Sequence, residues 1–398
     1  MGLKRYDLIV IGGGISGLSL AHYSAKAGLK TLLIEKESEA GGCLRTMKKP
    51  EGFWLEMGAH TCYNSYGNLI GIIEDRGALS SLQARQKVPF MMLVDGKVKS
   101  IASQLDFVEL LFSAPRLFTL SKSGMTVESY YSKILGRRNY QRVIGPALSA
   151  VPSQSADDFP ADMLFKRRKR RKDVIKKFTL RGGLQSIAEA VITGNSIEFV
   201  SGVEVRSVSS RDNSFCVFAE GSEYISDSIG IAVPPSAASA LLKDIEPSVA
   251  QSLSSIRISR IESTGVVVRK EAVSLPQFAG LIPEDDIFFS VVSRDILPDE
   301  HYRGFTFHFR AGLKKADKMK RICEVLGTDK FEGLFENTAV LPSPMLGHDQ
   351  IIRDVNRMLD GRHIYLTGNY FSGLAIEDCV ARSLTEFTRL MKQGSQET

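Results

Sequence analysis

A glycine-rich turn is the clearest sign of chemistry in the 398-residue sequence. Gly12, Gly14 and Gly17 have G-x-G-x-x-G spacing between a β-branched apolar run and a segment of helical periodicity. Gly12 allows the tight turn, Gly14 lets the backbone approach a pyrophosphate, and Gly17 lets helix and strand pack closely. The helix N-terminus at Ile15 and Ser16 would present N–H groups and a positive dipole to the phosphates. We therefore predict a dinucleotide site at this turn.

An acidic residue follows the next apolar run, residues 31–34. Glu35 ends that run 18 residues after Gly17, and Lys36 follows it. A carboxylate in this place can accept hydrogen bonds from a ribose, and it disfavours the additional phosphate of NADP. We therefore include Glu35 and Lys36 in the predicted site.

A second pair of glycines, Gly41 and Gly42, precedes Arg45 and Thr46. Glycines allow close approach of a loop to a bound dinucleotide, and a basic side chain can reach phosphate or flavin. The doublet resembles that of FAD oxidoreductases, in which this loop folds back over the dinucleotide. Cys43 stands where members often have arginine, so we expect Arg45 to substitute for it.

The third motif lies near the C-terminus, where a short apolar strand leads into a glycine turn and a helix. It contains Gly368, Asn369, Gly373, Ala375 and Ile376. The pattern resembles the C-terminal flavin motif of the flavin-containing amine oxidase superfamily. Its Gly-Asn-Tyr-x-x-Gly form, with a cysteine downstream, is similar to that of protoporphyrinogen oxidases. In that family the helix N-terminus faces the pyrimidine side of the flavin ring and stabilises the negative charge of the reduced ring.

The resemblance covers most of the chain and implies FAD as the cofactor. It implies that the turn of Gly58, Ala59 and His60 lies near the flavin, and that strand backbone at Val205 lies against the adenine. Residues 178–185 resemble the mid-chain Gly-Gly-Leu segment of the family, and residues 125–150 resemble its helical substrate lobe.

The cofactor would perform the redox step by accepting a hydride at its N5 atom, so few side chains need to be acid–base catalysts. We assign no catalytic side chain and predict no metal site. Tyr370 and Phe371 precede the flavin turn, so we expect them to line the substrate face. The resemblance implies oxidation of protoporphyrinogen or coproporphyrinogen, with oxygen or another acceptor restoring the flavin. Family members often grip a porphyrin carboxylate with Arg or Asn just before the strand at 90–93; here that approach is residues 85–89, beginning with Arg85.

The same motifs are compatible with other functions. One is a flavin amine oxidase or carotenoid-type desaturase, with the same flavin frame and a different substrate lobe. Another is an isomerase of the UDP-galactopyranose mutase type, which also has a Gly-Gly motif and an early Gly-x-His turn. The last is a protein that keeps FAD as a structural element without catalysis.

The elements that must position these motifs predict an α/β fold. Strands at 6–11 and 31–34 with a helix at 18–28 form a βαβ unit, and helices are predicted at 105–120, 127–148 and 184–191. A strand pair is predicted at 197–208 and 215–218, a buried strand at 229–233, and alternating strands across 255–310. We expect a Rossmann-like, GR2-type FAD-binding domain (1–75, 178–240 and 340–398) interleaved with a substrate-binding domain of mixed sheet (76–177 and 241–339), in which 100–177 form a helical lobe.

The positive charge of the chain is local. The chain has 51 Lys and Arg against 45 Asp and Glu, but the run Lys166–Lys172 alone supplies seven basic residues. Without it the balance is 44 to 45, which argues against a general nucleic-acid binder. The run is a solvated loop, a contact with an anionic membrane surface or an acidic substrate, or a local nucleic-acid contact.

Composition predicts an ordinary globular protein, with 43% hydrophobic and 24% charged residues. The lack of a long apolar stretch or a cleavable signal predicts a cytoplasmic location, with the cytoplasmic membrane as a peripheral contact. The partner expected is a small molecule, a tetrapyrrole or another apolar-bodied compound. Five scattered cysteines indicate buried free thiols rather than a disulfide framework.

Overall fold

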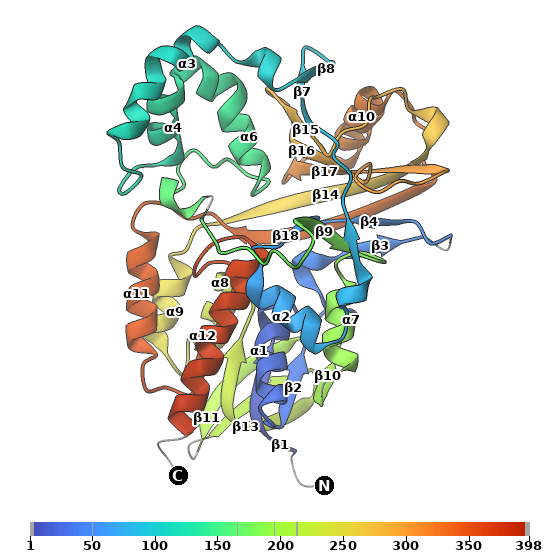
Figure 1. Ribbon diagram of the computed structural model, residues 1–398. Helices are drawn as coiled ribbons and strands as arrows, with labels where there is room; N and C mark the ends of the chain where they lie inside the picture. The colour runs from blue at the N-terminus through green and yellow to red at the C-terminus, as the bar shows by residue number, and fades with distance from the viewer. Residues whose placement is uncertain (1–3, 50, 165, 195, 212–213, 395–398) are drawn as a thin grey trace.

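A two-lobed arrangement is seen in the computed structural model, which describes residues 4–49, 51–164, 166–194, 196–211 and 214–394 (Figure 1). One lobe is built on a mostly parallel sheet and holds both chain ends. The other contains a second sheet and, beside it, a group of helices. The chain crosses between the lobes several times, as the sequence predicts.

The first sheet has the order β10-β2-β1-β13-β12-β11, with β19 beside β13. Strands β1, β2, β10, β13 and β19 pair in parallel, and β11 and β12 form an antiparallel edge. Their bounds are β1 (Arg5–Ile11), β2 (Thr31–Ile34), β10 (Ile197–Val200), β11 (Val205–Arg211), β12 (Ser214–Ala219), β13 (Ser222–Ile231) and β19 (Ile364–Leu366).

Helices cover both faces of this sheet, which is why β2 and the second half of β1, residues 8–11, are buried on both sides. One face packs against α1 (Ile15–Lys26), α2 (Gly67–Asp75), α7 (Ser186–Thr193) and α12 (Ile376–Gly394). The other packs against α8 (Pro235–Leu242), α9 (Pro247–Ser254) and α11 (His348–Met358). The predicted α/β, Rossmann-like class is confirmed.

The second sheet has the order β18-β14-β17-β16-β15-β7-β8 and is antiparallel except where β15 meets β7. A phenylalanine-rich core with Phe305, Phe307 and Phe309 lies between it and α10 (Lys315–Leu326). Its strands are β7 (Phe90–Val94), β8 (Lys97–Ser100), β14 (Ile258–Arg269), β15 (Gly280–Pro283), β16 (Phe288–Ser293), β17 (Tyr302–Arg310) and β18 (Gly333–Pro342), and the short helix η7 (Lys270–Ala272) follows β14.

Short strands lie between the two lobes. They are the hairpin β3 (Thr46–Lys48) and β4 (Trp54–Glu56), and the small sheet β5 (Cys62–Tyr63), β9 (Lys177–Leu180) and β6 (Leu82–Ala84). The short helices η1 (Gly42–Leu44) and η2 (Leu79–Ser81) join them to their neighbours. This layer carries the loops that face the first glycine turn.

The helical lobe is broken into short pieces rather than the two helices predicted at 105–120 and 127–148. Gly136, with φ of 95°, ends α4, and a π-helical turn follows. The pieces are η3 (Ala102–Gln104), α3 (Phe107–Ser113), η4 (Ala114–Phe118), α4 (Val127–Leu135), α5 (Arg137–Asn139), η5 (Tyr140–Ile144), α6 (Gly145–Ala150) and η6 (Ala161–Met163).

The strand predicted at 197–208 is also wrong as a single element. Its first part, β10, pairs with β2, and its second, β11, pairs with β12 at the opposite edge of the sheet. The predicted domain division stays a prediction, but α9 lies on the dinucleotide side of the boundary drawn at residue 241, because Val249 and Leu253 are buried against the first sheet. Within the described ranges, no helix is both long and apolar enough to cross a membrane.

Candidate functional site

The first glycine turn has the geometry that its motif predicts. Gly12 has φ of 103°, and a Cβ there would lie 2.7 Å from the carbonyl oxygen of Ala232. A Cβ at Gly17 would clash with the carbonyl oxygen of Gly12. Gly14 is the N-cap of α1 and offers no side chain to cap it, so the first-turn N–H groups at Ile15 and Ser16 stay free of a side-chain cap.

The second glycine pair lies directly against the first turn. Gly41 N donates to Gly13 O at 2.9 Å, and a Cβ on Gly42 would lie 3.0 Å from the Cα of Gly14. Gly42 has φ of 57°, in the left-handed region that favours glycine. Two segments about 25 residues apart thus form one wall of backbone without side chains, which fits the close approach of a dinucleotide.

Glu35 lies beside the same turn. Its carboxylate accepts hydrogen bonds from Gly13 N at 2.5 Å and from Glu37 N at 2.9 Å. The backbone after it pairs with the segment that leads into β11, because Val203 N donates to Glu35 O at 3.1 Å. Val205, which begins β11, is therefore near the predicted ribose end of the site. Lys36 is exposed and pairs with Glu37 at 3.8 Å.

The turn at residues 58–60 packs onto the second glycine pair. Ala59 N donates to Cys43 O at 2.8 Å, and a Cβ on Gly58 would lie 2.6 Å from the same oxygen. The Cys43 side chain is exposed. The expectation of buried thiols is therefore wrong for Cys43.

His60 lies close enough to Arg85 to feel its charge. Burial, and then the positive charge of Arg85, lower the pKa of His60 to about 4, so the imidazole is neutral at pH 7. Arg85 Nη1 donates to Thr61 Oγ1, and its Nε is buried without a hydrogen-bond partner among the described residues. His308 on β17 is buried, and burial with the nearby His60 lowers its pKa to about 3. Of His60, Arg85 and His308, Arg85 is therefore the residue that carries a positive charge at pH 7.

The C-terminal motif is joined to the first glycine turn by hydrogen bonds. Ser383 on α12 donates to Ser16 O on α1 at 2.8 Å, and its hydroxyl also meets that of Thr367, just before Gly368, at 2.8 Å. Thr367 N donates to Ile231 O at 3.1 Å, at the end of β13. The two ends of the chain therefore meet at the carboxyl edge of the first sheet, where ligands of such sheets bind.

The turn before α12 is held by the basic run. Gly373 has φ of 144°, and Asp378 accepts a hydrogen bond from Ala375 N at 3.3 Å. Arg168 pairs with Asp378 at 2.7 Å, and Lys166 donates to the carbonyl of Ser372.

Arg171 of the same run pairs with Glu74 on α2 at 2.5 Å. The run is therefore only partly the solvated loop or external surface that we considered, because three of its seven side chains bind within the protein.

A buried carboxylate behind the second glycine pair is a feature that sequence analysis missed. Glu56 accepts from Thr46 Oγ1 at 2.6 Å and from Leu184 N at 2.7 Å, and burial raises its pKa to about 8. Gln185 accepts from Thr46 N at 2.9 Å and donates to Ala40 O at 3.2 Å. The signal available was the Gly-Gly-Leu segment before Gln185; nothing marked Glu56.

The structure places Tyr370 and Phe371, which we expected at the substrate face, in the core between the first sheet and α11, where they are 1% and 6% exposed. Their contact with substrate stays a prediction. Tyr370 O accepts from His348 Nε2 at 2.6 Å, and the Arg382 guanidinium stacks on Phe371 at 3.8 Å. Arg45 is half-buried beside the glycine pair, and its carbonyl accepts from Met57 N at 2.9 Å.

Sequence comparisons find similar proteins mainly for the N-terminal part of the chain, which contains the two glycine clusters. Residues 10–75 match the family model of the NAD(P)-binding Rossmann-like domain. The chain is 32% identical over 108 residues to a 15-cis-phytoene desaturase of Narcissus pseudonarcissus, a match covering 27% of this chain and 19% of the relative. It is 31% identical over 97 residues to a flavin-containing amine oxidase of Danio rerio, covering 24% and 18%. The matches span about a fifth of each relative's length.

Comparison of structures covers the whole chain. A candidate protoporphyrinogen oxidase from Exiguobacterium sp. 255-15 superposes with a TM-score of 0.79 at 19% identity, over 99% of this chain and 100% of the other. Putrescine oxidase gives 0.70 at 13% identity (98% and 99%), and reduced UDP-galactopyranose mutase gives 0.74 at 14% identity (100% and 94%). The chain therefore shares the α/β fold of these flavin-containing amine oxidase-like structures: a Rossmann-like dinucleotide-binding lobe and a second, mixed sheet.

Proposed function

We propose that the chain binds FAD and acts as an oxidoreductase. One observation carries this proposal: the glycines of residues 12–17 and 41–42 touch, and the segment of residues 367–383 is hydrogen-bonded to them through Ser16. Such a convergence of remote glycine turns at the carboxyl edge of a parallel sheet suits a long dinucleotide better than a small ligand. The likeness of the whole fold to flavin-containing amine oxidases supports the choice of FAD.

Each part of this wall has a distinct task in the proposed complex. Gly14 and Gly42 leave room for the pyrophosphate, and the uncapped N-terminus of α1 offers it N–H groups. Glu35 would exchange its bond to Gly13 N for the ribose hydroxyl groups. The turn before α12, fixed by Asp378 and Arg168, would hold the ring end. Bound flavin supplies hydride acceptance at N5 and passes electrons to oxygen or another acceptor.

The substrate proposed is a porphyrinogen, protoporphyrinogen or coproporphyrinogen. The carboxylates of such a substrate need a cation, and Arg85 offers a buried N–H group without a hydrogen-bond partner among the described residues, while His60 near it stays neutral. The fold likeness to a candidate protoporphyrinogen oxidase over 99% of this chain supports the same substrate.

Two other activities have specific support. Sequence similarity to a phytoene desaturase favours removal of hydrogen from a polyene, and fold likeness to reduced UDP-galactopyranose mutase favours an isomerase. A desaturase substrate lacks carboxylates, so it would leave the buried Nε of Arg85 without an acceptor. An isomerase would work with reduced flavin and consume no electron acceptor.

The test is anaerobic reduction of the FAD-loaded protein, followed as loss of the oxidised flavin absorbance. We expect a porphyrinogen to bleach the flavin, and air to restore it with formation of porphyrin. Bleaching by a polyene or an amine alone would replace the proposed substrate. Activity only after chemical reduction, with no acceptor consumed, would favour the isomerase. A flavin inert towards every substrate and reductant would indicate a structural cofactor.

A further inference from the structure

Three polar side chains form a row across the second sheet. Ser263 on β14 lies opposite His308 on β17, and His308 lies opposite Ser290 on β16. The three residues are buried, with exposed fractions of 4%, 5% and 4%. Residues directly opposite each other on neighbouring strands have their side chains on the same face of a sheet. We call Ser263, His308 and Ser290 the polar row.

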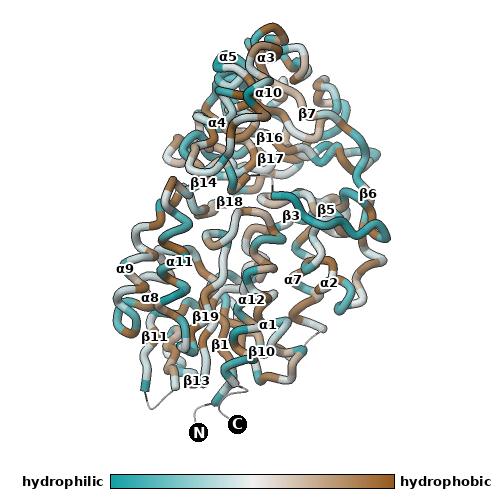
Figure 2. The backbone as a smooth tube through the Cα atoms, turned by 60° about the vertical axis from the view of Figure 1, so that its left-hand side comes forward, coloured by the Kyte–Doolittle hydropathy of each residue, from teal (hydrophilic) through white to brown (hydrophobic). Residues whose placement is uncertain are grey.

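The polar row lies on the face of the second sheet that is turned toward the dinucleotide lobe. The phenylalanines of β17 pack toward α10, so His308, which alternates with them along the strand, points to the opposite face. On that face Thr306 Oγ1 donates to Glu56 O at 2.7 Å, and His60, in the turn that follows Glu56, is near enough to lower the pKa of His308. Figures 1 and 2 both show β14 and β18 along the border with the dinucleotide lobe.

Two atoms of the polar row have no hydrogen-bond partner within the described ranges. Ser263 Oγ and His308 Nδ1 are 2.8 Å apart, and the second ring nitrogen of His308, Nε2, makes no further bond there. Ser290 Oγ is buried and also unpaired. A buried polar group that loses its bonds to water destabilises the protein unless a new partner replaces them. Two such atoms on neighbouring strands therefore indicate a place where a bound molecule supplies the partner.

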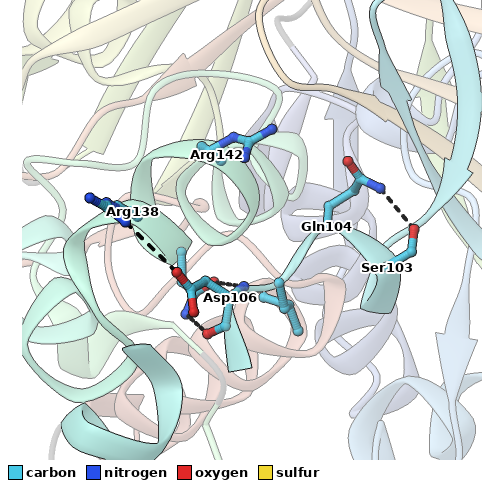
Figure 3. Close-up of a pocket in the computed structure, with 7 residues that line it drawn as sticks. Ser103, Gln104, Asp106, Arg138 and Arg142 are labelled. Atoms are coloured by element: carbon cyan, nitrogen blue, oxygen red, sulfur yellow. Dashed lines mark hydrogen bonds and ion pairs between the residues drawn. The ribbon is translucent and has the colours of Figure 1, made fainter. Parts of the chain in front are cut away.

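A pocket of about 270 Å³ in the helical lobe differs from the polar row in this respect (Figure 3). Asn139 is buried in its wall, and the amide of Asn139 is bonded to the backbone N–H and C=O groups of Asp106 at 2.7 and 2.9 Å. Arg142, which also lines the pocket, pairs with Glu284 at 2.8 Å. These polar groups already have partners within the protein, so the polar row has the stronger claim to a ligand.

The polar row suits an uncharged group of a ligand. Burial, and then the nearby His60, lower the pKa of His308 to about 3, so its ring is neutral at pH 7. The bond to Ser263 selects the position of the ring proton: when Nδ1–H donates to Ser263 Oγ, Nε2 is a hydrogen-bond acceptor. A neutral acceptor binds an N–H or O–H group and not a carboxylate.

We propose that His308, oriented by Ser263, accepts a hydrogen bond from a pyrrole N–H group of the substrate, and that Ser290 beside it makes a second contact. This inference rests on the proposed porphyrinogen substrate, whose inner pyrrole N–H groups are neutral donors and whose carboxylates lie at its periphery. The polar row then positions the ring system, while Arg85 binds a carboxylate.

The contact acts on the rate of oxidation as well as on binding. When a bridging C–H group of the porphyrinogen gives its hydride to bound flavin, the substrate loses two electrons and positive charge develops on the adjoining pyrrole. The N–H group of that pyrrole becomes a stronger donor, and its proton afterwards leaves to water. A fixed acceptor at this place therefore stabilises the transition state more than the ground state.

The test compares FAD-loaded variants by the rate at which coproporphyrinogen bleaches the flavin in the absence of oxygen. In His308→Asn the amide reaches the place of Nδ1 but no atom reaches that of Nε2, so bleaching should slow at least about tenfold. In His308→Gln the amide oxygen reaches the place of Nε2, so the rate should stay within about threefold of wild type. Ser290→Ala should slow bleaching about threefold.

His301→Asn is the matched control, because His301 is exposed and precedes β17, and this variant should react as wild type does. FAD affinity, reduction by dithionite and the unfolding midpoint should be alike in all variants, since a substrate contact leaves them unchanged. If His308→Asn does not fold, Ser290→Ala decides, and a rate equal to wild type in that variant would overturn the inference.

Equal rates in wild type and His308→Asn would also overturn it, as would a rate in His308→Gln as low as in His308→Asn. A fall in FAD affinity as large as the fall in rate would assign His308 a structural role instead. A wild-type flavin that no porphyrinogen bleaches would overturn the proposed substrate, and this inference with it.

Discussion

At the scale of single residues, the proposed cofactor site depends on glycines, because they have no side chain to fill the space for the dinucleotide. Gly42 faces Gly14 across a gap that a single methyl group would fill, since a Cβ would lie 3.0 Å from the Cα of Gly14. The spacing of the glycines in the sequence predicted a tight turn at each of the two clusters. It could not predict that the two clusters touch, because that contact depends on how η1 folds back.

The substitution Gly42→Ala should weaken FAD binding at least about tenfold, because it narrows the proposed pyrophosphate channel and strains a backbone with φ of 57°. Titration of the apoprotein by flavin fluorescence measures this. Gly52→Ala is the matched control, since Gly52 also has positive φ but no atom lies within 4 Å of its Cβ position. Equal losses in both variants would mean that strain, and not the gap, is responsible.

Arg85 should act on substrate rather than on cofactor. Arg85→Gln removes the buried cation, so KM for a porphyrinogen should rise about tenfold while FAD affinity stays unchanged. The pKa of His60 should also rise, because the positive charge that depresses it is gone. Lys87→Gln, an exposed neighbour, is the control for a non-specific charge effect. A KM equal to wild type in Arg85→Gln would remove the role proposed for this residue.

Glu56 should make stability depend on pH. Burial raises its pKa from 4.5 to about 8, so the folded state binds the proton more tightly than the unfolded chain. Its contribution to stability is therefore full below about pH 4.5 and is lost as pH rises through about 8. Glu56→Gln should flatten this decline in urea unfolding at pH 5 to 8, whereas the exposed Glu189→Gln should keep it. An unchanged slope in Glu56→Gln would contradict the raised pKa.

At the scale of elements, the sequence predicted β1, α1, β2, β19 and the start of α12 because each has a strong local signal. The sequence did not predict the features that depend on tertiary contacts. Residues 197–208 divide between two edges of one sheet, and Tyr370 and Phe371 turn into the core because α11 covers them. The bonds of Glu56 to Leu184 and of Ser383 to Ser16 join residues more than a hundred positions apart, so no local pattern marks them.

The contact between α1 and α12 should be measurable as stability. Ser383→Ala removes the bridge to Ser16 O and should lower the free energy of unfolding by about 1 kcal/mol. Thr385→Ala on the same helix loses only a bond to Ala381 O and should have a smaller effect. FAD binding should weaken in Ser383→Ala alone, because this bridge holds the two ends of the proposed site together. If Thr385→Ala weakened FAD binding and Ser383→Ala did not, that coupling would be excluded.

At the scale of the whole molecule, a dinucleotide lobe holds both chain ends, while the second sheet and the helical lobe lie at the other end (Figure 1). The predicted fold class therefore holds although its detailed domain boundaries stay a prediction. The cytoplasmic location likewise stays a prediction.

The most direct test of the central claim is the thermal unfolding of the apoprotein with and without excess FAD, with NADP as the comparison ligand. FAD at a hundred times its dissociation constant should stabilise the fold by about 2.7 kcal/mol and give a yellow protein with a flavin spectrum. NADP should have little effect, because Glu35 lies where its additional phosphate would be. A protein that stays colourless with excess FAD, and whose unfolding midpoint FAD does not raise, would contradict the account.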